Sequence, residues 1–240
     1  MKALKKFYYL PASLFIIFFL FFSSCYGPHV VGDGNVVEET REVSDFNKLE
    51  ISGAFRVFLT QGNNESLKLV ADENLHEYIK TRVINNRLII ESTIKILKAK
   101  KRHLYIQVKS LEDINLSGAI KLESKSAITA EKLKIEAGGA VEIDLDVRAN
   151  QIRGEFSGAC ETRLRGSADK VFIHASGGVK IRTYDLTANR FDLKLSGAGI
   201  AGIYAKEQLN VDITGAASVR YKGDPVIRKN TKGASSLRKY

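Results

Sequence analysis

The sequence predicts an all-β chain built as a repetitive parallel β-helix, or β-solenoid, with coils of about 19–20 residues. Two features predict this class. A short polar-Gly-Ala motif recurs at near-constant spacing, and apolar residues alternate with polar ones on both sides of each copy. Recurrence at a fixed period of this length is typical of stacked repeat architectures.

The motif first appears as Ser52-Gly53-Ala54 and then recurs through the second half of the chain. Its later glycines are Gly118, Gly139, Gly158, Gly177, Gly197 and Gly215, whose successive numbers differ by 21, 19, 19, 20 and 18. We expect each glycine to mark a bend that needs a positive φ or a close backbone approach. The Ser or Thr before it is suited to capping N–H groups in such a turn.

Apolar residues stand two, four and six positions before each glycine and two and four positions after it. Around Gly139 these residues are Leu133, Ile135, Ala137, Val141 and Ile143. On the upstream side only Glu112 and Gly154 break the rule. A period of two is that of a strand with one buried face, so each copy predicts strand, corner, strand.

A second set of small residues predicts another bend in each coil. Nine positions before the glycine the chain carries Ala130, Ala149, Ala168 and Ala188. One such unit cannot bury its apolar face alone, whereas parallel stacking of units gives a continuous core. The alternative class is a sandwich, which needs hairpin turns roughly every 8–12 residues and no fixed register.

Residues 1–24 at the N-terminus are predicted to form a lipoprotein signal peptide. Three lysines precede an apolar run from Leu10 to Phe22, which is too short to predict a membrane span, since a span needs about 20 residues. Phe22-Ser23-Ser24-Cys25 resembles a bacterial lipobox, in which the cysteine is acylated and becomes the new N-terminus. We therefore expect lipidation at Cys25, with a plain signal peptide as the alternative, followed by a flexible tether over residues 25–35.

Residues 36–110 are expected to form N-terminal strands or a cap. Strand patterns cover 36–43, 46–59, 67–71 and 103–108, and Asn85-Asn86 predicts a hairpin between 81–84 and 87–92. A single helical turn is expected over 74–79. The segment from Gly53 to Gly118 is long enough for about three further coils, so coils and capping hairpins both remain open. Regular repeats are predicted over 111–222 and a polar C-terminal cap or tail over 223–240, all within one domain, 36–240.

Composition limits the classes of function. The hydrophobic content of 44% fits a folded core, and the net charge of +10 falls to 10 − 3 = +7 once Lys2, Lys5 and Lys6 are removed. Basic residues are not interleaved with aromatic ones, so no nucleic-acid partner is expected. The basic run from Lys95 to Arg102 is interpreted as a solvated loop.

No pattern in the chain predicts a catalytic or metal site. The four histidines lack metal-ligand spacing: His29, His76, His103 and His174. Cys160 falls at an apolar position and is expected in the core. Five carboxylates on neighbouring predicted coils could serve as acid and base or bind Ca²⁺, although a charged solvent face explains them as well: Glu142, Asp144, Asp146, Glu155 and Glu161. We expect no enzyme activity, no cofactor and no metal.

The chain also resembles a known bacterial family. The repeated Ser-Gly-Ala turns, the Phe46-x-x-Leu-x-Ile-Ser-Gly-Ala segment and the stretch Val70-Ala71-Asp72-Glu73-Asn74-Leu75 are similar to those of the putative auto-transporter adhesin, head GIN domain family. The resemblance covers roughly Val43 to the C-terminus. It implies a repetitive all-β domain, commonly secreted or lipid-anchored, and supplies no catalytic residues.

We therefore expect a non-enzymatic lipoprotein of the cell envelope, held in the membrane through Cys25, on the periplasmic or the surface side of what we expect to be the outer membrane. Its β-solenoid would present a rigid surface for binding or adhesion to a glycan or a protein. Two alternatives remain at this point: a carbohydrate-active β-helix enzyme, and a structural module that stacks end to end.

Overall fold

The computed structural model describes residues 28–240. Residues 1–27, which include the expected signal peptide and Cys25, lie outside the described residues. The elements in chain order are β1 (His29–Val31), β2 (Val36–Arg41), β3 (Lys48–Gln61), β4 (Ser66–Asp72), the 3-10 helix η2 (Glu73–Leu75), β5 (Ile79–Ile84), β6 (Arg87–Ser92), β7 (Lys95–Lys98), β8 (Arg102–Val108), β9 (Asp113–Ser124), β10 (Ile128–Lys222), β11 (Val226–Lys232) and β12 (Ser235–Lys239).

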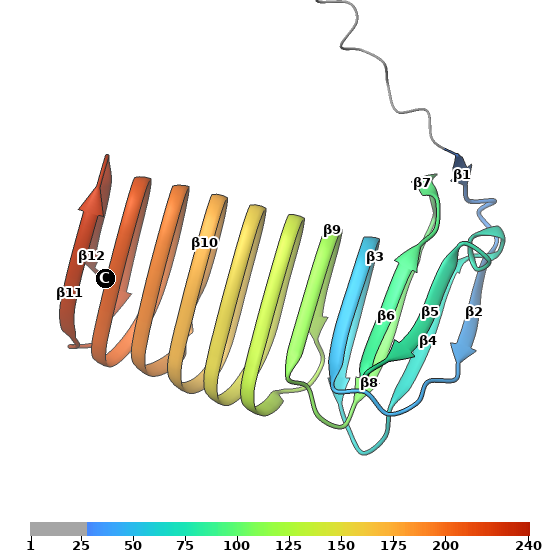
Figure 1. The fold of residues 1–240 in the computed structure, drawn as a ribbon, viewed down its shortest axis with the longest axis horizontal. Helices are drawn as coiled ribbons and strands as arrows, with labels where there is room; N and C mark the ends of the chain where they lie inside the picture. Colours follow the sequence, from blue (N-terminus) through green and yellow to red (C-terminus); the bar gives the residue numbers. More distant parts are fainter. Residues whose placement is uncertain (1–27) are drawn as a thin grey trace, which may run out of the picture.

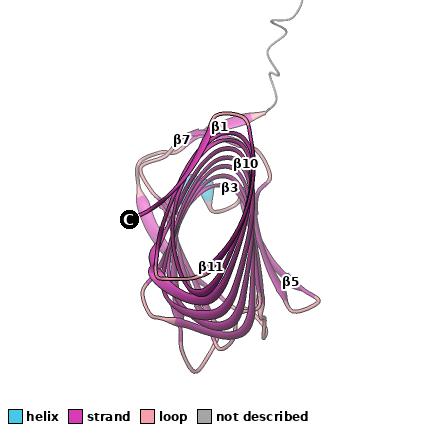
Figure 2. Ribbon diagram, turned by 90° about the vertical axis from the view of Figure 1, so that its left-hand side faces the viewer, coloured by secondary structure: helices cyan, strands magenta, loops and turns pink. Residues whose placement is uncertain are grey.

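The described chain is almost entirely β-structure, which confirms the predicted all-β class. β10 alone runs for 95 residues and winds around the core in successive turns, which we call coils (Figure 1). Seen along the stack, the coils lie one behind another with a common outline (Figure 2). No helix in residues 28–240 is both long and apolar enough to cross a bilayer.

Neighbouring coils pair in parallel with their motifs in register. Gly53 in β3 is the partner of Gly118 in β9, and Gly118 is the partner of Gly139 in β10. The same pairings set Ile51 beside Leu116 and Leu116 beside Ala137. Because side chains alternate along a strand, a shared register keeps every apolar position on the inner face.

The motif glycines form a column in which each contacts the backbone of the one before it. A Cβ on Gly118 would lie 2.2 Å from the carbonyl oxygen of Gly53, and one on Gly177 would lie 2.7 Å from that of Gly158. These glycines also have positive φ, 112° at Gly118 and 95° at Gly177. The column therefore excludes a side chain for two reasons, backbone contact and conformation.

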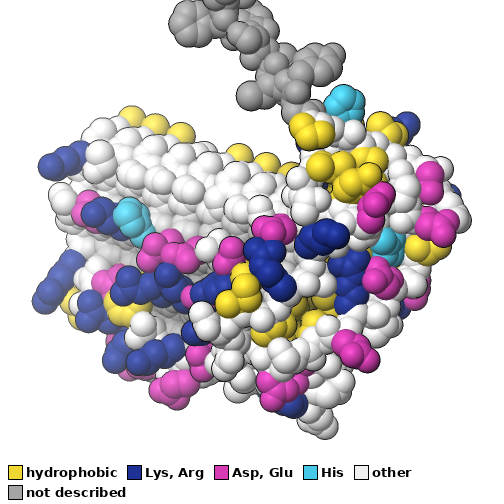
Figure 3. Space-filling model, turned by 45° about the vertical axis from the view of Figure 1, so that its right-hand side comes forward, with side chains coloured by type: hydrophobic (Ala, Val, Ile, Leu, Met, Phe, Trp, Pro, Cys, Tyr) yellow, Lys and Arg dark blue, Asp and Glu magenta, His cyan; other side chains and the backbone are white. Residues whose placement is uncertain are grey.

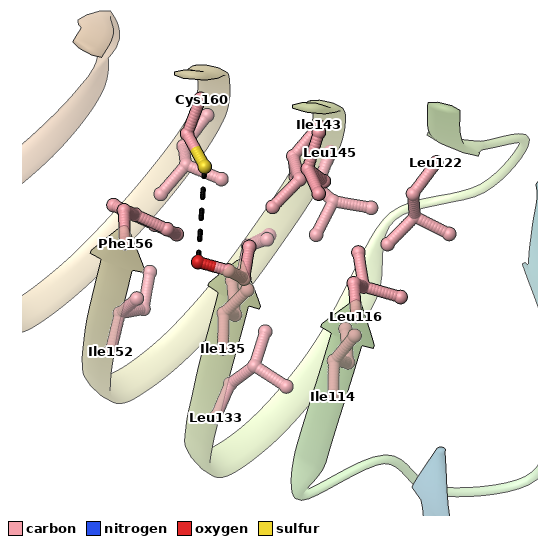
Figure 4. Packing of buried hydrophobic residues seen from close by; sticks show 14 of the residues in the cluster. Ile114, Leu116, Leu122, Leu133, Ile135, Ile143, Leu145, Ile152, Phe156 and Cys160 are labelled. Carbon is pink, nitrogen blue, oxygen red and sulfur yellow. Dashed lines mark hydrogen bonds between the residues drawn. The ribbon is translucent and has the colours of Figure 1, made fainter. Parts of the chain in front are cut away.

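The interior is a set of apolar ladders, with Leu133, Ile135 and Val141 all buried. Figure 4 shows such side chains converging between coils, with the Cys160 thiol 3.8 Å from the Ala137 carbonyl oxygen. Each fully buried aliphatic side chain contributes roughly 1.5–3 kcal/mol. Gly154 breaks the apolar rule because a Cβ there would lie 2.8 Å from the Phe156 ring, which takes its place.

The predicted alanine bend is also present. Ala168 and Ala188 are buried, and each is followed by two outward polar residues before the chain turns inward again. At these bends amides bind the carboxylates of the preceding coil: Asn150 donates to Glu131 at 2.8 Å and Asn189 to Asp169 at 2.9 Å. Such pairs satisfy the polar groups that a tight corner exposes.

The segment between Gly53 and Gly118 places no coil between these two glycines, since β3 and β9 are directly paired. It lies on the other side of β3, where β6 and β8 pair with it in parallel and β4 and β2 add antiparallel strands. The predicted hairpin is confirmed: β5 and β6 are antiparallel, and Asn85 and Asn86 have φ of 51° and 59°. The expected helical turn is the shorter η2.

Two short strands form where a tether and a solvated loop were expected. β1 lies within the expected tether and β7 within the basic run, and the two pair in parallel, with Val30 beside Ile96. Both of these side chains are partly buried against the core. The apolar residues between the charges of each segment therefore pack on the molecule, which the charge pattern alone did not indicate.

A buried carboxylate holds this end of the molecule together. Asp72 accepts backbone N–H groups from Gly34 at 3.1 Å, Lys100 at 3.0 Å and Lys101 at 3.1 Å. Burial on its own would raise the pKa of Asp72, but these donors and the Lys100 charge outweigh it and hold the pKa below its ordinary value.

The C-terminal segment adds one further coil where a cap or tail was expected. β11 pairs in parallel with residues 208–214 and β12 with 217–221. Gly233 has φ of 95° and stacks on Gly215, so Lys232-Gly233-Ala234 is another copy of the motif. Two of its inward register positions are polar, since Lys229 pairs with Val211 and Thr231 with Ile213, whereas Ile227 and Leu237 keep the apolar pattern beside Leu209 and Val219.

The glycine column predicts a sharp difference between two adjacent glycines. Gly177→Ala places a Cβ against Gly158 at a positive φ, so we expect a loss of about 2 kcal/mol or more. The melting temperature of the whole chain, measured by circular dichroism, should fall by roughly 4–8 °C.

Gly178→Ala is the matched control, because no atom lies within 4 Å of its Cβ position and its φ is not positive. Its melting temperature should stay within about 1 °C of the wild type. Equal effects of the two substitutions would contradict the assignment of the column.

Candidate binding surface

Each coil presents two outward faces, one on either side of its glycine. The pre-corner face carries residues three and five positions before the glycine: Lys134, Glu136, Arg153, Glu155, Phe172, His174, Asp192, Lys194, Asn210, Asp212, Arg228 and Asn230. The post-corner face carries residues three, five and seven positions after it: Arg56, Phe58, Lys121, Glu123, Lys125, Glu142, Asp144, Asp146, Glu161, Arg163, Arg165, Lys180, Arg182, Tyr184, Arg220, Lys222, Arg238 and Tyr240.

Four of the five candidate carboxylates lie on the post-corner face, and all four are paired with cations. Glu142 accepts from Lys121 at 2.6 Å, and Glu161 lies 3.2 Å from Arg182. Arg165 joins the other two, Asp144 and Asp146, with its Nε 2.7 Å from the Asp146 carboxylate. These contacts are the cross-strand ion pairs expected of a charged solvent face.

The fifth carboxylate, Glu155, is not near the others. It stands before the Gly158 corner and so lies on the pre-corner face, where Arg153 is 3.8 Å away. The five candidate carboxylates therefore do not lie on one face. The glycine corner turns the chain between Glu155 and Glu161, which sends the two side chains to different faces.

The ion pairs also shift the pKa of several side chains on this surface. The hydrogen bond from Lys121 to Glu142 raises the pKa of that lysine, and the bond from Arg165 to Asp146 does the same for the arginine. Burial alone would raise the pKa of Glu123, but Arg56 at 3.0 Å and two lysines outweigh it and lower the pKa.

The histidines and the cysteine are placed as structural or surface groups. His76 Nδ1 lies 2.6 Å from Glu39, His103 packs edge-on to Phe58, and His174 is exposed. Cys160 is buried as predicted, and burial raises the pKa of its thiol. Among residues 28–240 no group of three or more His, Cys, Asp or Glu side chains is arranged to hold a metal ion.

Aromatic side chains also stand on the outward faces, a feature that the sequence prediction missed. Phe58 stacks on Tyr105 with ring centroids 4.8 Å apart, and Lys125 Nζ lies 4.6 Å from the Phe58 centroid. On the pre-corner face, Phe172 lies 6.0 Å from both Arg153 and Arg190. The available signal was an aromatic residue at an outward position between two inward apolar ones, as in Val57-Phe58-Leu59.

Shallow hollows accompany these side chains on both faces. One of about 580 Å³ on the pre-corner face includes Phe172, Asp192 and Asn210. Another of about 660 Å³ on the post-corner face includes Arg182, Tyr184 and Arg220. Figure 3 shows one side of the molecule, where basic and acidic side chains form a mixed band across the coils.

Comparison with known proteins identifies the family. The chain matches the model of the family described as "putative auto-transporter adhesin, head GIN domain" over residues 45–225. No curated protein matches it.

Solved structures share the fold at low sequence identity. A putative adhesin from Bacteroides fragilis is similar with a TM-score of 0.84 and 22% identity, over 88% of this chain and 100% of that one. A putative lipid binding protein from Parabacteroides distasonis has a TM-score of 0.73 and 20% identity, over 89% and 100% of the two chains. The match to the family model covers most of the chain, and the protein therefore belongs to the head GIN domain family of putative auto-transporter adhesins.

Proposed function

We propose that this protein is a non-enzymatic, lipid-anchored protein of the cell envelope whose β-coils form a rigid β-solenoid that binds a partner through its outward faces. The family description as an adhesin head supports a role in binding. Parallel register and the glycine column support the solenoid, because a sandwich would pair its repeats as antiparallel hairpins.

The observation that carries the non-enzymatic assignment is the pairing of the outward carboxylates. A glycosidase needs two carboxyl groups about 5–10 Å apart, one held as an acid and one as a base, on either side of a cleft. Here Arg165 contacts both Asp144 and Asp146, and Lys121 contacts Glu142. Each of these carboxylates is thus held in an ion pair, which is the arrangement expected of a charged solvent face.

The end-to-end stacking alternative is disfavoured by the last coil. An apolar terminal coil would offer a second copy a continuous core. Ile227 and Leu237 are apolar, but Lys229 and Thr231 interrupt the pattern at the inward positions above Val211 and Ile213. An inward-pointing charge at an edge strand is a common protection against edge-to-edge association.

The lipid anchor is proposed from the sequence around Cys25. Acyl chains bury about 0.8 kcal/mol per CH₂ group in the bilayer, and more than one chain gives stable anchoring. β1 lies at the end of the molecule opposite β11 and β12 (Figure 1). An anchor at Cys25 would therefore present the C-terminal coils away from the membrane.

A glycan array probed with the whole chain in neutral detergent tests the binding role. We expect retention of one or more glycan classes, with the bound glycans recovered intact by mass spectrometry. The variant Glu142→Gln/Asp144→Asn should give no change in product formation, since neither carboxylate acts in catalysis. Released products that disappear in this variant would establish the enzyme alternative and overturn the proposal.

Metabolic labelling with radioactive palmitate tests the anchor. Cells that make the wild type should incorporate label into the protein and retain it in the membrane fraction, whereas Cys25→Ala should do neither. Cys160→Ala is the control and should keep the label, because this thiol is buried in the core. An unlabelled wild type, or label retained in the Cys25 variant, would exclude lipidation at this residue.

A further inference from the structure

Opposite charges are matched between neighbouring coils along most of the post-corner face. Lys121 pairs with Glu142 in the next coil, Arg56 with Glu123, and Arg182 with Glu161. Matched charges are favourable across strands, and like charges directly opposite each other are destabilising. Like charges are also register partners on this face, Arg56 with Lys121 and Glu123 with Asp144, but each of these side chains is matched by an ion pair with another neighbour.

The matching fails at the C-terminal coils. Arg220 in β10 and Arg238 in β12 are direct register partners, so two cations stand side by side. Within residues 28–240 no carboxylate lies within 4.0 Å of either guanidinium. The pair is an unfavourable feature of the free protein, and a bound anion would remove the repulsion.

A hollow lies directly beside this pair. It is the post-corner hollow of about 660 Å³, and its lining includes one acidic side chain, Asp185, and five basic ones. Of the basic ones, Arg163, Arg165, Lys180 and Arg182 form ion pairs with carboxylates of neighbouring coils, and Arg220 is the fifth. Apolar surface is exposed there at Ile200, which is 51% exposed, while Gly202 lies beneath the Tyr184 ring. The site therefore offers guanidinium groups around a surface on which a ring can rest.

Aromatic side chains border the same site. Tyr184 lies over Gly202, where a Cβ would be 2.3 Å from its ring. Lys222 Nζ lies 5.2 Å from the Tyr184 centroid and 4.9 Å from the Tyr240 centroid. These contacts hold a third cation beside Arg220.

We propose that this surface, the arginine strip of Arg220 and Arg238 with Tyr184 and Lys222, binds a linear acidic polysaccharide that carries carboxylate groups. Guanidinium groups bind carboxylates in a bidentate manner, and the strip sets two of them side by side at the strand spacing, about 4.8 Å. A linear polyanion can engage both of them at once, which raises its avidity.

A polysaccharide fits this surface better than a nucleic acid. Single-stranded nucleic acids are bound by aromatic rings that stack on successive bases. Here Tyr184 is packed over Gly202 and Lys222, so its ring is already engaged. Polar groups suited to sugar hydroxyls are present instead, as Ser236 and Ser218 stand side by side with their oxygens 3.3 Å apart.

The proposal rests on the binding role above and names the ligand class for one of its faces. The probe is polygalacturonate, and neutral dextran is the comparison. Binding to the whole chain in neutral detergent, followed by biolayer interferometry, should be seen with polygalacturonate alone and should weaken as salt rises. Arg220→Gln/Arg238→Gln should raise Kd at least tenfold.

The control variant is Lys194→Gln/Arg228→Gln, which removes the same charge from the pre-corner face and should change Kd less than twofold. Melting temperature supplies a second readout. Because the arginine pair is repulsive, Arg220→Gln/Arg238→Gln should melt at the wild-type temperature or above it, a pattern typical of residues kept for binding rather than stability. A lower melting temperature would indicate a structural role and overturn the proposal.

Equal increases in Kd for polygalacturonate in the two double variants would also overturn the proposal, since binding would then reflect net charge alone. Tighter binding to a single-stranded oligodeoxynucleotide than to polygalacturonate would overturn the ligand class. If the protein binds neutral glycans on the array but does not bind polygalacturonate, the arginine strip proposal fails and the general binding role stands. An array with no bound glycan, and no polygalacturonate binding, would count against both.

Discussion

The contact of glycine on glycine at the corner is the constraint on which the rest of the structure depends. At this point each coil brings its backbone against the carbonyl of the previous coil, at a φ that other residues avoid. A side chain there would separate the coils and break the parallel ladder on both sides. With the column intact, one register choice is repeated along the stack, and the apolar positions of every coil fall on the inner face.

The same constraint divides the outer surface. Because the chain turns at each glycine, residues close in sequence, such as Glu155 and Glu161, lie on different faces. On each face, side chains at the same position of successive coils form ladders, so each side chain interacts mainly with those of the adjoining coil. Matched charges along a ladder stabilise the stack, and a mismatch, as between Arg220 and Arg238, marks a place where the sequence departs from what stability favours. This is why the outward side chains, rather than the repeated shape of the corner, carry the functional argument.

Much of the repeat region could be predicted from the sequence, because its signals are local and periodic. The glycine corners, the alanine bends, the buried Cys160 and the Asn85-Asn86 hairpin all follow from residue type and spacing. The N-terminal part could not be predicted in the same way, since the pairing of Gly53 with Gly118 depends on where the long segment between them folds. The last copy, around Gly233, was missed because Lys232 replaces the usual Ser or Thr and polar residues, Lys229 and Thr231, interrupt the inward apolar pattern. The aromatic side chains on the outer faces were hidden among the apolar residues of the core ladders.

A cross-linking measurement tests the central claim, that the glycine column sets coil next to coil in exact register. Ala119 and Ala140 are direct partners, at the strand spacing of about 4.8 Å, which is within the range of a disulfide. Ala159 lies one coil further on, roughly twice that distance from Ala119 and beyond disulfide reach. The variant Ala119→Cys/Ala140→Cys should therefore form a disulfide on mild oxidation, identified by mass spectrometry of unreduced peptides, and Ala119→Cys/Ala159→Cys should not. A disulfide in the second variant and none in the first would contradict the register, and with it the assignment of inner and outer faces.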